Sequence, residues 1–298
     1  MNIMNIRKSP IAGSWYKGTN TELTEQIQEL FQNSVHGIQD DPFNSLKNTK
    51  IDDLLGIIVP HAGYMYSGSV ATHGYHTLFK SIPHVDTVIV IGPNHRGVRT
   101  DISMYPEGKW VFPNGSVDID HELVRFAKAY EFSDIHVDFD PISQSQEHSI
   151  DIQIPFLLYL FNQKFNIFPI CLGSQSNQTT DALSKFLFDL IQTKKSKKIV
   201  IVASSDLSHE YNYDILIQND TNFLELLLLG DVTSLEKFRL DHHMTSCGYG
   251  AIFTLIKLAN SYTQPSIKLL KYANSSQITG KSGGYTVGYP CLSVTAIR

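Results

Sequence analysis

Four short runs of apolar, largely β-branched residues constrain the fold of this chain more than any other feature of its sequence. They span residues 54–59, 87–91, 166–171 and 198–203. Nearly continuous apolar runs of this length are typical of strands that are buried on both faces of a parallel sheet. Segments with helical spacing separate the runs, over residues 69–79, 120–130, 147–161 and 180–193. This alternation predicts βαβ units, and so an α/β fold with a central, mostly parallel sheet flanked by helices.

The last third of the chain has a different pattern, with helices predicted first and strands after them. The helices are expected over residues 214–229, 232–240 and 247–262, and the strands over residues 266–273 and 286–296. We expect both strands to be edge strands of the same sheet. A chain of 298 residues could form one large domain or two ordinary ones. Because no linker rich in Pro, Gly or Ser interrupts it, we predict a single α/β domain over residues 1–298.

Composition and charge exclude several classes of protein. Hydrophobic residues make up 42% of the chain, which is enough to bury a core and excludes disorder as the main state. The net charge of −5 disfavours a nucleic-acid partner. The longest apolar run, residues 154–161, is far shorter than the roughly 20 residues that span a bilayer, so no membrane association is expected. Three scattered cysteines fit a reducing compartment, and we expect a cytoplasmic protein.

Histidines follow three of the four predicted buried strands. His61 comes after the first strand, His95 after the second, and His209 shortly after the fourth. In open α/β sheets, ligands bind outside the carboxyl ends of the strands, so these imidazoles are expected to converge. Imidazole is both a frequent metal ligand and the usual acid or base near neutral pH. The spacing therefore indicates a metal site or a proton-transfer site at this edge of the sheet.

Two acidic residues lie close to histidines in the sequence, and each has two interpretations. Asp206 and His209 are three residues apart, which would place both on one face of a helical turn. Asp206 could cap that helix, or could bind a metal or orient an imidazole. Glu147 and His148 open a predicted helix, where a negative charge is favoured at the N-terminus. A role in the pocket is the alternative for this second pair.

Cys247 is the cysteine with the clearest chemical context. It precedes Gly248 at the start of a predicted helix, where the helix dipole lowers the pKa of a thiol and favours the thiolate. A thiolate binds metals or attacks carbon. Cys171 and Cys291 lie in or near the end of predicted strands and are expected to be core thiols.

Seven motifs occur along the chain in the order seen in the Memo family. They are Ala12-Gly13-Ser14-Trp15-Tyr16, Pro60-His61-Ala62-Gly63-Tyr64, Gly92-Pro93-Asn94-His95, Glu147-His148-Ser149, Ser204-Ser205-Asp206-Leu207-Ser208-His209, Thr245-Ser246-Cys247-Gly248 and Tyr272-Ala273-Asn274-Ser275-Ser276. The chain therefore resembles this family, and in particular protein B of the AmmeMemoRadiSam system, from about residue 7 to its C-terminus. The resemblance also favours one domain over two.

The resemblance implies a LigB-like fold, similar to that of the class III extradiol ring-cleavage dioxygenases, which hold non-haem Fe(II) with two histidines and a carboxylate. His61 and His95 match the two histidine ligands, and Cys247 stands where the dioxygenases have their glutamate ligand. His209 matches an acid–base histidine, Asp206 matches a pocket carboxylate, and His148 is a further pocket residue. The thiolate makes the site softer, so iron or copper is the expected metal, with zinc as a third candidate.

Three functions compete at this stage. The first is a metal-dependent oxidoreductase in which His61, His95 and Cys247 bind the metal, while His209 and Asp206, with His148, move protons for a small organic substrate. The second is a hydrolase or transferase with Cys247 as nucleophile and His209 or His61 as base. The third is a scaffold whose pocket, lined by Trp15, Tyr64 and Asn94, binds a peptide or a protein without turnover. The resemblance also implies a radical-SAM pathway protein as a partner.

Overall fold

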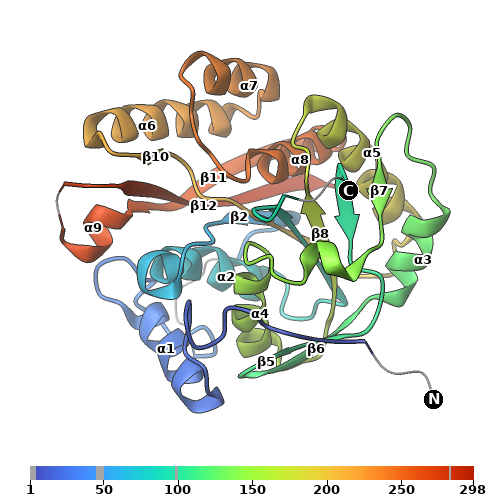
Figure 1. The fold of residues 1–298 in the computed structure, drawn as a ribbon, viewed down its shortest axis with the longest axis horizontal. Coiled ribbons are helices and arrows are strands. Elements are labelled where there is room, and N and C mark those ends of the chain that lie inside the picture. The colour runs from blue at the N-terminus through green and yellow to red at the C-terminus, as the bar shows by residue number, and fades with distance from the viewer. Residues whose placement is uncertain (1–4, 45–49, 98–99, 282) are drawn as a thin grey trace.

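The four apolar runs form parallel strands at the centre of a large mixed sheet (Figure 1). The computed structural model describes residues 5–44, 50–97, 100–281 and 283–298. The central strands lie in the order β8, β3, β9 and β2, and each neighbouring pair is parallel. Their bounds are β2 (Leu54–Val59), β3 (Thr87–Pro93), β8 (Asn166–Leu172) and β9 (Ile199–Ser204). Every residue of β2, β3 and β9 is buried, so the predicted α/β fold with a mostly parallel central sheet is confirmed.

The two C-terminal strands join the same sheet, but only one of them is an edge strand. β12 (Thr286–Ile297) pairs with β2 in antiparallel orientation, and β11 (Thr263–Asn274) pairs with the outer side of β12. The two-residue β10 (His209–Glu210) pairs with the start of β12. The expectation of two edge strands is therefore wrong for β12. Its nearly continuous burial, unlike the exposed pattern of β11, reflects this internal position.

The opposite edge of the sheet is built from short strands that the apolar pattern did not indicate. β6 continues the sheet beyond β8, and β5 and β1 follow it, while β4 pairs with β8 and β7 pairs with β4. The bounds are β1 (Ile6–Lys8), β4 (Ile102–Met104), β5 (Lys109–Phe112), β6 (Gly115–Ile119) and β7 (Val137–Asp138). Strands of two to five residues are too short to show a period in the sequence.

Helices cover both faces of the sheet (Figure 1). α2 packs on β2, β11 and β12, whereas α8 packs on β2, β3, β9 and β12 and also against α5. Among the helices of the described residues, none combines the length and the hydropathy needed to cross a membrane. The bounds are α1 (Asn20–Gln32), α2 (Ser69–Ser81), α3 (His121–Ala129), α4 (Ile154–Phe161), α5 (Asn177–Thr193), α6 (Tyr213–Leu229), α7 (Val232–Asp241), α8 (Tyr249–Asn260) and α9 (Ser275–Thr279).

One predicted helix begins later than its apolar pattern indicates. Residues 147–150 are irregular, a short 3₁₀ turn spans Asp151–Gln153, and α4 starts only at Ile154. Pro155 stands in the first turn of α4, the one place in a helix where its missing N–H costs nothing. The irregular segment before α4 is free to carry Glu147 and His148 to the carboxyl ends of the strands.

Candidate functional site

The carboxyl ends of β2, β3 and β9 open into a cavity of about 550 Å³. All the histidines that follow these strands reach it, as does the segment before α8. The histidine, aspartate and cysteine side chains that line the cavity are His61, His95, His148, Asp206, His209 and Cys247. The structure thus brings together residues up to 186 positions apart in the sequence.

His61 is buried directly after β2, and its hydrogen bonds fix which ring nitrogen carries the proton. The Ser204 hydroxyl donates to the carbonyl oxygen of Ser149 at 2.6 Å, so its oxygen must accept from Nδ1 of His61 at 3.0 Å. Nδ1 is then protonated, and Nε2 presents its lone pair. That nitrogen lies 3.0 Å from Sγ of Cys247. Burial, followed by the neighbouring imidazoles, lowers the pKa of His61 well below its usual value.

Cys247 lies ahead of α8, not within its first turn. The first helical residue is Tyr249, and Gly248 is the residue that caps the helix. The amide of Gln175 donates to the carbonyl oxygen of Cys247 at 2.8 Å and anchors this backbone. Burial first, and then the carboxylate of Asp206, raise the pKa of the Cys247 thiol well above its usual value. The expectation that the helix start lowers this pKa is therefore wrong for the metal-free protein, because desolvation outweighs the dipole.

His95 is oriented by Glu147, which the sequence presented only as a helix start or a pocket residue. The Glu147 side chain is 1% exposed and accepts the backbone N–H of His95 at 2.6 Å and its ring Nδ1 at 3.0 Å. Burial opposes the charge of Glu147, but the hydrogen bonds from His95 and Ser149 outweigh it and lower the pKa to about 2. The ionised carboxylate keeps the proton of His95 on Nδ1, so its Nε2 faces the cavity.

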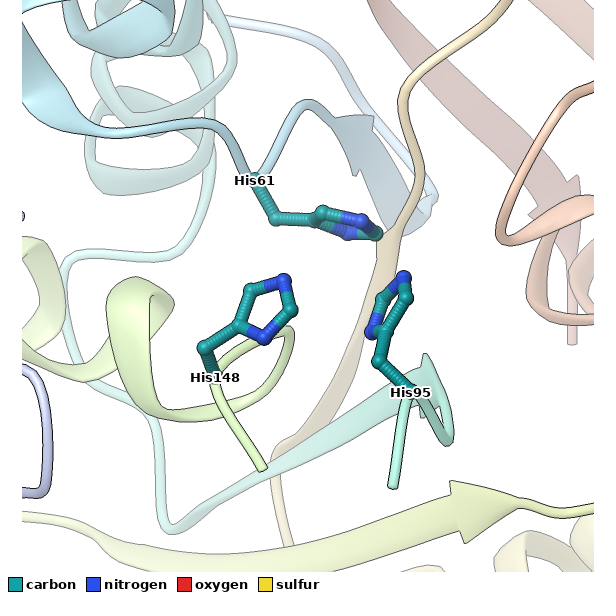
Figure 2. A group of neighbouring side chains, drawn as sticks. All are labelled: His61, His95 and His148. Carbon is teal, nitrogen blue, oxygen red and sulfur yellow. The ribbon is translucent and has the colours of Figure 1, made fainter. Parts of the chain in front are cut away.

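His148 completes a group of three imidazoles (Figure 2). Its ring stacks on His95 with centroids 4.4 Å apart and contacts Trp15 at the same centroid distance. Burial lowers the pKa of His148 to about 4, so the ring is neutral near pH 7. Trp15 lines the cavity as predicted from its motif.

Asp206 and His209 do not share a helical turn. Residues 205–208 are irregular and His209 begins β10, so the prediction that Asp206 caps a helix is wrong. Asp206 instead accepts the backbone N–H of His61 at 2.8 Å, and burial raises its pKa to about 6. Nδ1 of His209 lies 2.9 Å from the carbonyl oxygen of Leu207, which can only accept, so Nδ1 is the protonated nitrogen of the neutral ring.

Two residues expected to line the pocket lie elsewhere. The Tyr64 ring packs in the core against Tyr16 and Phe156, and its hydroxyl donates to a backbone carbonyl. Asn94 donates to the carbonyl oxygen of Ser143 and contacts a core thiol. The apolar wall of the cavity comes from residues that sequence reasoning missed, Met65, Tyr66, Tyr285 and Tyr289. Met65, Tyr66 and Tyr285 are exposed and give no periodic signal, so only the fold reveals them.

Two groups of side chains in the described part of the chain have the spacing to hold a metal ion. The first is His61, His95 and His148, and the second is His61, Asp206 and Cys247. Within each group, the potential ligand atoms lie within 4.8 Å of one another. The triad predicted from the sequence falls across both groups, because His61 belongs to each, His95 to the first and Cys247 to the second.

Fold and site define an α/β protein with a pocket of imidazole, thiol and carboxylate groups at the carboxyl ends of its parallel strands. The family model described as Memo-like protein matches residues 7–292. The chain belongs to the Memo family. A MEMO1 family protein of Saccharolobus islandicus is 36% identical over 284 residues, covering 95% of this chain and 97% of the relative. The MEMO1 family proteins of Sulfurisphaera tokodaii and Saccharolobus solfataricus are 35% and 36% identical, over 95% of this chain and 97% and 98% of their own lengths.

Proposed function

We propose that the pocket binds a redox-active metal ion, iron or copper, through His61, His95 and Cys247. The observation that carries this proposal is the 3.0 Å contact between Nε2 of His61 and Sγ of Cys247, in which the nitrogen presents its lone pair. Burial disfavours charge on both residues, so a thiolate–imidazolium pair is not the stable state of the contact. A cation in place of the thiol proton would pair with the thiolate and use the imidazole lone pair.

The donor set decides which metals fit. Imidazole suits zinc, copper and iron, and thiolate shifts the preference toward Cu(I), zinc or thiolate-bound iron. A bound iron or copper ion supplies electron transfer and Lewis acidity at the cavity floor. Ser204 and Glu147 hold the two imidazoles with their Nε2 atoms facing the cavity. Iron or copper therefore remains our proposal, with zinc as the third candidate.

The rest of the cavity supports a small organic ligand and proton movement next to it. We assign proton transfer to Asp206, whose pKa of about 6 lies near neutrality, and to His209, with His148 as a further candidate. Trp15, Tyr66 and Tyr285 offer an aromatic wall for a ligand with an apolar or aromatic portion. On this proposal the protein is a metal-dependent oxidoreductase of the cytoplasm. A radical-SAM pathway protein is its proposed partner, which co-purification from native extract would test.

The same 3.0 Å contact favours one second candidate, a hydrolase with Cys247 as nucleophile and His61 as base. The raised pKa of the thiol opposes it, because the attacking species is the thiolate. Rapid alkylation of Cys247 that continues unchanged after a chelator is added would favour the nucleophile over the ligand. A peptide-binding scaffold would show neither metal nor fast alkylation.

Metal content tests the proposal directly. The protein, purified without a histidine tag, is expected to carry iron or copper at up to one ion per chain by inductively coupled plasma mass spectrometry. His61→Ala should lose that metal, because His61 belongs to both candidate ligand groups. His121→Ala, which removes an exposed imidazole, serves as the matched control and should retain it. Equal metal content in His61→Ala and the parent chain, or none in either after reconstitution, would refute the proposed site.

A further inference from the structure

Three imidazoles from separate segments face one space in the cavity (Figure 2). His61 follows β2, His95 follows β3, and His148 lies in the irregular segment before α4. Each offers one nitrogen, and these three atoms lie within 4.8 Å of one another. Figure 2 shows one nitrogen of His95 and one of His148 turned toward the ring of His61. No atom of Cys247 belongs to this group.

A single buried carboxylate accepts a hydrogen bond from one of the three rings and lies close to a second. Oε1 of Glu147 is 3.0 Å from Nδ1 of His95 and 3.4 Å from Nδ1 of His148. With both Nδ1 atoms beside this anion, both Nε2 atoms are directed toward His61. A carboxylate behind an imidazole is the usual partner of a metal-binding histidine, because it fixes the ring and raises the basicity of the ligating nitrogen. Glu147 supplies this partner to His95 and places its negative charge beside the ring of His148.

The ring of His148 has no hydrogen bond that would explain its orientation. Its Nδ1 is buried and has no hydrogen-bond partner among the described residues. The ring is instead held by contacts on its faces, from His95 at 4.4 Å and 27° and from Trp15 at 4.4 Å. Burying a polar imidazole in this way costs free energy unless something uses its nitrogens. A cation at Nε2 would use one of the two nitrogens, while Nδ1 keeps its 3.4 Å contact with the carboxylate of Glu147.

We infer that His61, His95 and His148 form a second ligand set, which holds a borderline divalent cation without the Cys247 thiolate. This inference rests on the proposed metal site, with which it shares His61 and His95. Three neutral imidazoles with an open fourth position are a common donor set for such cations. Two ligand atoms on a tetrahedral ion lie roughly 3.4 Å apart for metal–nitrogen distances near 2.1 Å. Because these atoms lie within 4.8 Å of one another, the rings would need to close by up to about 1.4 Å around an ion.

The two ligand sets predict that loss of the thiol weakens binding of a divalent ion without abolishing it. His148 is then a metal ligand in its own right, and an ion held by the three imidazoles would remain in the pocket when Cys247 is alkylated or oxidised. Both ligand sets would use Nε2 of His61, which lies 3.0 Å from Sγ of Cys247. One ion at a time can use that nitrogen.

Cobalt(II) titration distinguishes the two sets, because thiolate ligation produces a near-ultraviolet charge-transfer band that imidazole ligation lacks. Four proteins are compared after removal of metal: the parent chain, Cys247→Ser, His148→Ala and Cys247→Ser/His148→Ala. We expect Cys247→Ser to bind one cobalt ion per chain without the thiolate band. The double variant should bind about tenfold or more weakly than Cys247→Ser, as expected for the loss of a metal ligand. His121→Ala controls for surface imidazoles, and circular dichroism of each variant checks the fold.

The outcomes separate this inference from the proposed function. If the parent chain binds cobalt with the thiolate band and Cys247→Ser binds none, the proposed site stands and the three-imidazole set is refuted. Equal affinity in Cys247→Ser and the double variant would also refute the role of His148. Absence of binding in the parent chain would refute both. If His148→Ala unfolds, His148→Gln replaces it. The glutamine side chain fills a similar volume to the imidazole but has no basic nitrogen that could bind a metal.

Discussion

Two buried polar clusters share the segment 147–151, and they differ in how completely their polar atoms are paired. The first, which we name the Arg7 cluster, consists of Arg7, Ser9, Tyr16 and Asp151. Arg7 donates to Asp151 at 2.5 Å and to the carbonyl oxygens of Gln144 and Glu147, and its guanidinium lies 3.9 Å from the centre of the Trp110 ring. Ser9 and Tyr16 donate to the remaining oxygen of Asp151. Charge and hydrogen bonds are satisfied within the protein.

The pocket cluster is less completely buried, because Cys247 is half-buried and His95 is exposed, and its reactive atoms face a cavity. Nε2 of His61 and His95 carry lone pairs. Among the described residues, Asp206 has no cationic side chain bonded to it, and Nδ1 of His148 has no hydrogen-bond partner. Burial lowers the pKa of His61 and raises those of Asp206 and Cys247. The comparison shows that burial of charge alone does not mark a functional site. A functional site is marked instead by buried groups whose lone pairs the fold leaves unused.

The largest expected effect comes from breaking the Arg7 cluster. Arg7→Met leaves the carboxylate of Asp151 buried without its counter-charge, which we expect to lower the free energy of unfolding by about 3–5 kcal/mol. Urea denaturation of the metal-free protein near pH 7 measures it. Lys50→Met is the matched control, because Lys50 pairs with Asp52 on the surface, where both side chains are more than half exposed. That control should change stability by less than about 1 kcal/mol, and a similar small change in Arg7→Met would contradict the comparison.

Glu147 contacts both clusters, and its substitution gives the next effect. Its backbone carbonyl accepts from Arg7, whereas its side chain orients His95. Glu147→Gln keeps the backbone contact but removes the anion behind the imidazole, so we expect metal affinity to fall by about 10–100-fold. Competition with a chromogenic chelator measures this affinity. Glu122→Gln, which removes a half-exposed carboxylate paired with lysines, should leave it unchanged. Unaltered metal affinity in Glu147→Gln would mean that this carboxylate stabilises the fold but does not contribute to metal binding.

The sequence could predict the strands and the strand-end histidines because both follow from local pattern. Apolar runs give the buried strands, and the chain direction then places His61 and His95 at one edge of the sheet. The Arg7 cluster could not be found this way, because Arg7 and Asp151 are 144 residues apart and neither lies in a periodic pattern. The choice between the two interpretations of Glu147, a helix start or a pocket role, could not be made from the sequence for a related reason. An acidic residue ahead of an apolar run fits a helix start, and only the fold shows that α4 begins at Ile154.

The protonation states of the pocket residues were harder to predict than the identity of the residues that line the pocket. Cys247 was identified correctly as a cavity residue, but its pKa direction depends on burial and on Asp206, which are consequences of tertiary structure. The side chains of Met65, Tyr66 and Tyr285, which line the cavity, are exposed and carry no pattern at all. Local sequence therefore specifies which groups reach the site, whereas desolvation sets the protonation state of those groups.

The smallest expected effect is the most direct test of desolvation in the pocket. Burial raises the pKa of Asp206 to about 6, so the folded protein binds this proton more tightly than the unfolded chain does. The contribution of Asp206 to stability is therefore present below its unfolded pKa and is lost as the pH rises through 6.

In the metal-free protein, Asp206→Asn removes the charge and keeps an oxygen that can accept the N–H of His61. We expect this variant to be more stable than the parent chain by roughly 1–2 kcal/mol at pH 8, with the difference vanishing near pH 4. Urea denaturation at a series of pH values, with a chelator present, measures this difference in stability. A difference that stays constant across that pH range would show that the carboxylate of Asp206 is charged and fully paired, like that of Asp151.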